Sequence, residues 1–512
     1  MTHLVPLLVA VPLLGAVVPF LLGGRFPRFS RRATAAVLLL QFALAILVVR
    51  DVARTGSVSY VVGGLPAAYG IGLLVDALSS VFVLLVAGSG AVFYCTVRTD
   101  ATGPTDSLWL LLVAGLTGVT VTADVFNLYV FLEISGLAAY ALVAGRRDGA
   151  AALAALKYLL VGTVGATLYL LGIGYAYVAT GTLAMADLRV ALAGVGYESP
   201  LVLASFAFVT LGLAVKLALF PLHQWKPDAY ATAPVDVSAL LATLGSTVPG
   251  YAFVRLTFDV YTVDLFAAVP LVQHSLLAVG VVSVLAGGYL TLRQSNLRRL
   301  LAYSSILQFG LVVVGLALAT TAAVTGALVL LVANAVSKGG LYVAAGLFER
   351  ERGATTVSAF AGLGRAWPVT AGAAAVVFAS LVGLPPSAGF AGKWYVALAA
   401  VESDAWLVAT VVLLSTLLSL AYAGRVVERL FLAGEAATAA TPGRVPAEHV
   451  RATDGGVGGN SPGVSESPPT VTLNRDRLAV GIVVGTAVAT VVLGVGSSAF
   501  ADWVAPVVEG WL

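Results

Sequence analysis

Long apolar runs separated by short polar segments cover most of this chain. A helix needs about 20 apolar residues to cross a bilayer, and runs of roughly 17–27 residues recur here. We therefore predict an all-α polytopic membrane protein with about fourteen transmembrane helices. The predicted spans are 3–23, 33–50, 72–97, 107–123, 125–145, 153–179, 200–222 continuing through 234–245, 246–262, 268–292, 298–319, 322–347, 366–383 continuing through 386–401, 405–424 and 478–500.

Two of these spans are interrupted by proline and glycine. The breaks read "FPLHQWKPDAYATAPVD" and "VGLPPSAGFAG", and they lie five spans apart. Broken membrane helices expose backbone groups only where protein or a water-filled cavity covers them. Lys216 precedes the first break, whereas Lys393 follows the second. This reversed order favours two inverted five-helix repeats.

The positions of arginine test the number of spans. Nearly all arginines near the spans follow odd-numbered ones, which places them on one side of the membrane, and the exceptions Arg54 and Arg189 fall in longer loops. The positive-inside tendency makes that side cytoplasmic. We therefore expect a multi-pass plasma membrane protein with both termini outside. The arginines concerned are Arg25, Arg28, Arg31, Arg32, Arg98, Arg146, Arg147, Arg293, Arg298, Arg299, Arg350, Arg352, Arg425 and Arg429.

The pattern divides the chain into five parts. We predict N-terminal helices in 1–106, a first repeat in 107–262 and a second in 263–432. The segment 433–477 is rich in small and polar residues without a period, which predicts a flexible cytoplasmic linker. The last helix and tail occupy 478–512. Between the second and third spans, "SVSYVVGGLPAAYGIGL" is typical of a short outer β-hairpin.

The composition excludes several classes of protein. The chain is 59% hydrophobic and 10% charged, whereas soluble domains are about 25% charged. Its single cysteine, Cys95, excludes an intrachain disulfide, and the absence of Cys-rich motifs argues against iron–sulfur ligation. We find no phosphate-binding or dinucleotide motif and no metal-ligand spacing. We therefore expect no cofactor, no redox reaction by this chain alone and no nucleic-acid partner.

Lysine and arginine are used differently. The basic loops contain arginine, whereas four of the five lysines lie in or beside predicted spans. Arginine stays protonated in essentially any site, but a desolvated lysine can lose its proton. This partition indicates that lysine handles protons and that arginine fixes topology. The proton-transfer candidates are Lys157, Lys216, Lys338 and Lys393, with snorkelling to the interface as the alternative for each.

Glu133 lies near the middle of the span 125–145. A carboxylate there costs roughly 2.5–3.5 kcal/mol and faces a bundle interior or a wet path. Lys216 or Lys157 could be its partner, and a permanent structural ion pair is the alternative to a titrating one. Lys226 lies in the polar break, so we expect its ammonium to reach the interface.

Three further residues are candidates for ion or proton handling. His223 stands beside the first break, where its imidazole could relay protons or simply hydrogen-bond the turn. Asp76 and Asp124 are candidates for ion contacts, although interfacial solvation is the simpler explanation for both.

Several long stretches resemble the antiporter-like subunits shared by respiratory complex I and the Mrp-type multisubunit cation/proton antiporters. They are "ADVFNLYVFLEISGLAAYALVAG", "LKYLLVGTVGATLYLLGIGYAYVATGTLAMADL", "AVKLALFPLHQWKPDAYATAPVDVSALLA", "NLRRLLAYSSILQFG" and "GLPPSAGFAGKWYV". The length and "GTLAMADL" look most like the D subunit of the Mrp type. The resemblance implies fourteen helices, two inverted repeats and a lateral chain of titratable groups that feeds two half-channels. It assigns Glu133, Lys157, Lys216, Lys338 and Lys393 to that chain.

The sequence departs from this family at three positions. Thr247 stands where lysine is frequent and is followed by Pro249 instead of glycine; Asn334 stands where many members have histidine; Asp236 replaces a usual proline. Thr247 and Asn334 cannot titrate in the useful range. The proton path between Lys216 and Lys338 is therefore open to question and could run through water.

These observations predict a proton-conducting subunit of a multisubunit sodium/proton antiporter. Its expected partners are other membrane subunits, protons, sodium and lipid. The first alternative is a proton-pumping membrane subunit of a complex I-like oxidoreductase or membrane hydrogenase. A stand-alone solute carrier and a degenerate scaffold subunit are further alternatives.

Overall fold

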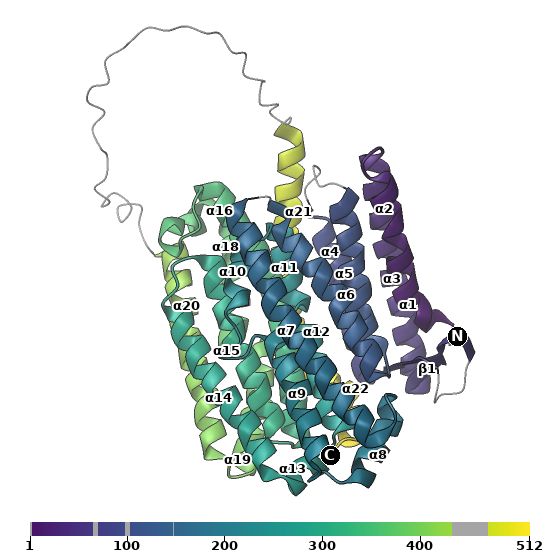
Figure 1. The fold of residues 1–512 in the computed structure, drawn as a ribbon. Helices are drawn as coiled ribbons and strands as arrows, with labels where there is room; N and C mark the ends of the chain where they lie inside the picture. The colour runs from purple at the N-terminus through teal and green to yellow at the C-terminus, as the bar shows by residue number, and fades with distance from the viewer. Residues whose placement is uncertain (1–2, 65–69, 98–102, 147, 433–468) are drawn as a thin grey trace, which may run out of the picture.

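The computed structural model describes residues 3–64, 70–97, 103–146, 148–432 and 469–512. In these ranges the chain forms a bundle of long, roughly parallel helices (Figure 1). Thirteen described helical segments are long and apolar enough to cross a membrane. The short apolar helix α18 and its continuation α19 supply a fourteenth crossing. The predicted all-α polytopic membrane fold is confirmed.

The N-terminal part forms one edge of the bundle, at the right of Figure 1. A two-stranded antiparallel hairpin pairs Ser57 with Asp76, as the sequence predicts. Asp76 then caps α4, because its carboxylate accepts a hydrogen bond from the N–H of Ser79. The elements are α1 (Leu4–Gly15), α2 (Val17–Leu22), α3 (Pro27–Thr55), β1 (Ser57–Val61), β2 (Gly72–Asp76) and α4 (Ala77–Tyr94).

Two sets of helices follow, and in each the fourth crossing is broken. The first set contains α5 (Gly103–Val121), α6 (Val125–Val143), α7 (Gly149–Thr180), the short α8 (Met185–Val195), the broken pair α9 (Pro200–Leu217) and α10 (Trp225–Thr232), and α11 (Val235–Leu244) with α12 (Thr247–Arg255). After the short α13 (Asp264–Ala268), the second contains α14 (Pro270–Leu292), α15 (Leu297–Ala317), α16 (Thr321–Arg352), the short α17 (Leu363–Ala366), the broken pair α18 (Pro368–Val382) and α19 (Ala388–Glu402), and α20 (Trp406–Phe431). The chain ends with α21 (Pro469–Val495) and α22 (Ser497–Glu509).

The two sets share a local feature at the start of their second helix. Asp124 caps α6 and forms an isolated β-bridge with Ala184, while Asn296 caps α15 and forms a bridge with Thr356. The broken pairs run in opposite directions in Figure 1, since α9 lies below α10 whereas α18 lies above α19. Both observations agree with an inverted repeat. The domain boundaries at 107–262 and 263–432 stay predictions.

The first break differs from our prediction. The second half of the broken span is α10, within 225–232, and not the segment 234–245. The residues Val235–Val260 form a single crossing, so the predicted division at 246 is wrong. The sequence "WKPDAYAT" is too polar to be recognised as part of a transmembrane span from hydropathy. Its side chains Trp225, Lys226 and Tyr230 are nevertheless buried against neighbouring helices. Protein covers this segment, so it needs no apolar composition to lie in the membrane.

The predicted linker lies mostly outside the described residues, which omit 433–468. Its last part, 469–477, is helical, so the prediction of an irregular segment is wrong there. Pro469 occupies the first position of α21, where a missing N–H is tolerated. Asp476 lies 3.2 Å from Arg350 of α16, and this ion pair fastens the start of the last crossing to the bundle.

A buried charge cluster joins the hairpin to the end of the first set. The Arg255 guanidinium lies 2.5 Å from the Asp76 carboxylate and 3.4 Å from Asp259, with the Trp511 ring 5.8 Å from its carbon. Burial raises the pKa of Asp76, but Arg255 and the Ser79 N–H outweigh burial and hold that pKa below its ordinary value of 3.8. The pair thus contributes stability above the unfolded pKa and loses it as the pH falls through the folded pKa.

We predict that Asp76→Asn lowers the free energy of unfolding at neutral pH by about 3 kcal/mol, because it leaves a buried guanidinium short of a partner. The wild type should lose part of its stability below about pH 4, and the variant should lack this part of the acid transition. Thermal unfolding of the purified complex across that pH range measures both effects. The exposed Asp187, changed to Asn, is the matched control. An Asp76→Asn variant as stable as this control would contradict the structural role of the pair.

Candidate functional site

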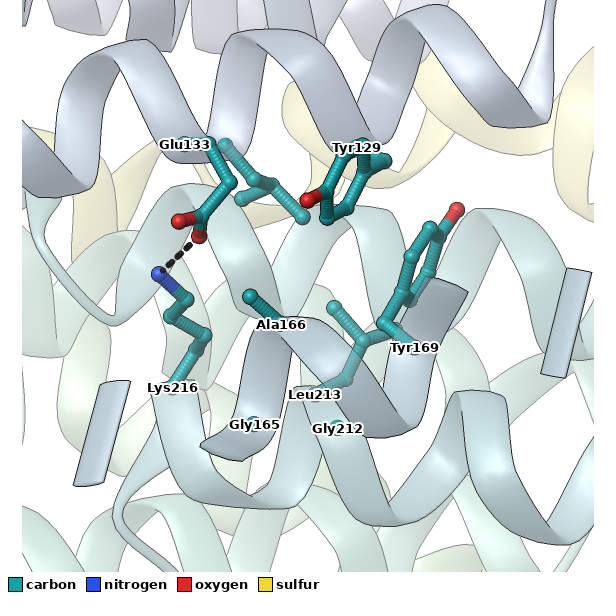
Figure 2. A pocket seen from close by; sticks show the side chains of 9 residues that line it. Tyr129, Glu133, Gly165, Ala166, Tyr169, Gly212, Leu213 and Lys216 are labelled. Atoms are coloured by element: carbon teal, nitrogen blue, oxygen red, sulfur yellow. Dashed lines mark hydrogen bonds and ion pairs between the residues drawn. The ribbon is translucent and has the colours of Figure 1, made fainter. Parts of the chain in front are cut away.

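The structure pairs Glu133 with Lys216. The Lys216 Nζ lies 3.1 Å from the Glu133 Oε1 and donates to the Tyr140 hydroxyl at 3.2 Å. The lysine side chain is 8% exposed and the glutamate 20%. Figure 2 shows the two side chains meeting at one end of a small cavity that Tyr129 and Tyr169 border at the other. Of the two partners that the sequence allowed for Glu133, the structure selects Lys216.

Close helix packing brings this pair together. A Cβ at Gly212 of α9 would lie 2.6 Å from the Gly165 carbonyl oxygen of α7, so only glycine permits this approach. Small residues at such contacts let membrane helices pack backbone to backbone. On α6, a Cβ at Gly136 would lie 3.1 Å from the Lys216 Nζ. Glycine at these positions therefore leaves room for the lysine between three helices.

The first break places Lys216 in the last turn of α9. A cation is favoured at a helix C-terminus, where the final carbonyls are free. Two of these carbonyls are bound from neighbouring segments. The Val215 oxygen accepts from the Trp225 Nε1 at 3.0 Å, and the Lys216 oxygen accepts from the Ser246 Oγ at 2.8 Å. These hydrogen bonds satisfy the two carbonyls at the end of α9, where no further helical turn does so.

An aromatic column covers the pair on the side of α10. The Tyr140 ring packs edge-on against Tyr158, which stacks on Trp225 with ring centroids 4.1 Å apart. Trp225 in turn contacts Tyr230 edge-on. The column extends from the Glu133–Lys216 pair to Tyr230, whose ring centre lies 5.4 Å from the Lys226 Nζ.

Lys157 lies apart from the pair. Its Nζ binds Asp228 of α10 at 2.9 Å, its side chain is half exposed, and Arg299 of α15 binds the other oxygen of the same carboxylate at 2.6 Å. These contacts fasten α10 to α7 and α15. They agree with the snorkelling alternative for Lys157 and give it a part in positioning α10.

His223 is buried in the turn of the first break. Its ring stacks on Phe220 and packs edge-on against Tyr303. Within the described residues its Nδ1 has no hydrogen-bond partner. The carbonyl of His223 accepts from the N–H of Lys226, so the imidazole and this lysine belong to one turn.

Lys338 and Lys393 occupy the second set of helices. Lys338 is fully buried in the middle of α16, where its Nζ donates to the Leu301 carbonyl at 2.8 Å and to the Ser304 hydroxyl. Lys393 of α19 donates to the Val382 carbonyl at the second break, at 2.9 Å. Within the described part of the chain, neither ammonium has a carboxylate in ion-pair contact.

A small polar cavity lies between α15, α16, α18 and α19. Its lining includes the polar residues Gln308, Asn334, Ser337 and Ser380. Both amide atoms of Asn334 and the hydroxyl of Ser337 are buried, and the described residues offer them no partner. Buried polar groups are nearly always hydrogen-bonded to protein or ordered water. The cavity has about the space that one water molecule needs.

Lys226 lies in a different environment from the one that its sequence context predicts. Lys226 does not reach the interface: it is 1% exposed, and its Nζ donates to the Ser246 hydroxyl at 2.9 Å. The snorkelling prediction is wrong because α10 lies inside the bundle, where the rings of Phe309 and Tyr230 cover the ammonium of Lys226. The sequence did contain one signal for the burial of Lys226: the other four lysines lie in or beside predicted spans, and the same environment could have been predicted for this one.

The structure gives both candidate ion contacts other partners. Asp76 binds Arg255, and Asp124 caps α6 by accepting from the N–H of Asn127 at 2.7 Å. Among the described residues, no group of three His, Cys, Asp or Glu side chains is arranged to hold a metal ion.

Comparisons with known proteins agree with this geometry. A family model described as NADH:quinone oxidoreductase/Mrp antiporter, TM matches residues 122–419, which contain both breaks and all the lysines. The N subunit of the NADH-quinone oxidoreductase of Desulforudis audaxviator is 40% identical over 84% of this chain and 87% of its own length. The D subunit of the Na(+)/H(+) antiporter of Bacillus subtilis is 29% identical over 82% of this chain and 85% of its own.

A solved structure, the Mrp complex from Dietzia sp. DQ12-45-1b, contains a chain with the same fold. The TM-score is 0.85 at 24% identity, over 100% of this chain and 97% of that one. With the family match over more than half of its residues, this protein belongs to the NADH:quinone oxidoreductase/Mrp antiporter transmembrane family.

Proposed function

We propose that this protein is the proton-conducting membrane subunit of a multisubunit monovalent cation/proton antiporter, with sodium as the coupled cation. The observation that carries this proposal is the Glu133–Lys216 ion pair, which lies in a bundle that contains further buried lysines. The antiporter relative in Bacillus subtilis supports the assignment of the reaction and of an assembly with other subunits.

The pair is suited to changing its protonation state because two opposing effects act on its charges. An opposite charge within about 4–6 Å favours ionisation of both, while burial disfavours it. A proton that arrives on Glu133 removes the attraction and releases Lys216 to pass its own proton onward.

In the second half of the path, the proton passes from Lys338 to Lys393. Both lysines bind backbone carbonyls and lack carboxylate partners in the described chain, so nothing fixes their charge permanently. The cavity at Asn334 and Ser337 lies among the helices that carry them and could hold the intervening water. His223 at the first break is a further group able to exchange protons on the approach to this path.

The arginine distribution supports an orientation in the plasma membrane with both termini outside and the segment 433–477 in the cytoplasm. Other subunits of the complex would supply the cation pathway. No described residue cluster in this chain offers one, since Asp76 and Asp124 are engaged in ion pairing and helix capping.

A second candidate is a proton-pumping subunit of a complex I-like oxidoreductase. The 40% identity to the N subunit of an NADH-quinone oxidoreductase supports it, as the 29% identity to the antiporter relative supports the first candidate. The two functions use the same proton path and differ in what drives it. Vesicles that contain the whole complex separate them: a sodium gradient alone drives proton movement in the antiporter, whereas the oxidoreductase requires electron transfer to quinone.

We predict that Glu133→Gln and Lys216→Met each lower sodium-driven proton exchange by roughly tenfold or more, since each removes a proton-transfer group. A pH-sensitive dye inside vesicles that hold the whole complex measures the rate. Arg293→Gln, at an exposed guanidinium that contacts only the neighbouring Tyr289 hydroxyl in the described chain, is the control and should retain the wild-type rate. Wild-type rates in both site variants would refute the proposed function.

We also predict that Asn334→Leu lowers the exchange rate by roughly tenfold, because it replaces the amide that binds water in the cavity. A high-resolution density map of the wild-type complex should contain an ordered water beside Asn334 and Ser337. Leu330→Met alters an apolar side chain of the same lining without removing a polar group, so it should leave the rate nearly unchanged. A fully active Asn334→Leu variant would show that protons bypass this cavity.

A further inference from the structure

Lys226 is a buried cation without a carboxylate partner in the described chain. It is 1% exposed, and its Nζ lies 4.6 Å from the centre of the Phe309 ring and 5.4 Å from that of Tyr230. Asp228, two residues along α10, is held by Lys157 and Arg299 instead. Aromatic ring faces and one hydroxyl stabilise the charged form of an amine less strongly than a carboxylate in an ion pair does. The site therefore tolerates both the charged and the neutral form of the side chain.

The position of Lys226 links the two halves of the path. Ser246 accepts from the Lys226 Nζ and donates to the backbone carbonyl of Lys216, so a single hydroxyl contacts both residues. On the other side, Lys226 and Lys338 both contact α15, Lys226 through the Phe309 ring and Lys338 through the Ser304 hydroxyl.

The start of α12 adds a second polar group beside this contact. Thr247 is fully buried, and its hydroxyl finds no partner among the described residues. Thr247 directly follows Ser246, which binds Lys226. The amine of Lys226 is thus the titratable group that α10 brings to the start of α12.

We propose that Lys226 carries the proton between Lys216 and Lys338. This inference rests on the proposed proton-conducting function. In the transfer, one proton leaves the Lys216 ammonium and binds the neutral Lys226 amine, which then passes it to a neutral Lys338.

Three substitutions separate a proton carrier from a structural cation. Lys226→Met keeps the length and apolar volume of the side chain, Lys226→Arg keeps a charge that does not dissociate, and Lys226→His keeps a titratable group. A fourth variant combines Lys226→Met with Thr247→Lys, which moves the amine to α12, beside the Ser246 that binds Lys226.

Sodium-driven proton exchange is measured in vesicles that contain the whole complex, per amount of assembled complex. We expect Lys226→Met and Lys226→Arg to lose roughly tenfold or more of the rate. Lys226→His should retain several times the rate of the arginine variant, and Lys226→Met with Thr247→Lys should recover several times that of Lys226→Met alone. If Lys226→Met fails to assemble, the comparison of histidine with arginine decides.

Two results would overturn the inference. One is a wild-type rate in Lys226→Met. The other is restoration by arginine as good as by histidine, which would make Lys226 a fixed structural charge. Either result, obtained while Glu133→Gln remains inactive, leaves the proposed function intact and removes only this carrier. Activity in Glu133→Gln and Lys216→Met, by contrast, removes the proposed function itself.

Discussion

The energetic cost of a carboxylate inside a membrane is the constraint on which this structure depends. Glu133 is tolerated in an apolar helix because the Lys216 ammonium meets it at 3.1 Å. That contact requires α6, α7 and α9 to approach closely, which glycines at the helix contacts permit. It also requires α9 to end just after Lys216, so that the side chain and the free carbonyls of the helix end occupy one site. The break in the helix, the glycines at the helix contacts and the aromatic column together position and cover this one charge pair.

The same physical solution appears at the second break. The carbonyls at the end of α9 are bound by Trp225 and Ser246, and those at the end of α18 by Gln308 and Lys393. Freed backbone groups thus provide polar contacts within the membrane at two places without added charge. At the second break, Lys393 binds a carbonyl that accepts a hydrogen bond but does not neutralise the ammonium, whereas Lys216 at the first break is paired with Glu133. The carbonyl stabilises the ammonium of Lys393 only partly, which a mobile proton requires.

The sequence predicted much of the fold for a simple reason. Long apolar runs and one-sided arginines are direct consequences of the bilayer, so the number of spans followed from them, and proline and glycine marked the two breaks. Glu133, Lys216, Lys338 and Lys393 could be selected as candidate site residues because burying a charge in a membrane is costly. Hydropathy failed at α10, because protein and not lipid covers that helix. For the same reason the polar context of Lys226 suggested exposure, whereas tertiary packing buries it. The partner of Lys157 was equally invisible, since Asp228 is 71 residues away.

The central claim is that Glu133 exchanges its proton during transport instead of forming a permanent ion pair. Infrared difference spectroscopy of the whole complex, recorded on addition of sodium, tests it directly. The account predicts a protonated-carboxyl stretching band that shifts in heavy water and is absent from the Glu133→Gln complex. A difference spectrum in which the wild type and Glu133→Gln share every carboxyl band would contradict it.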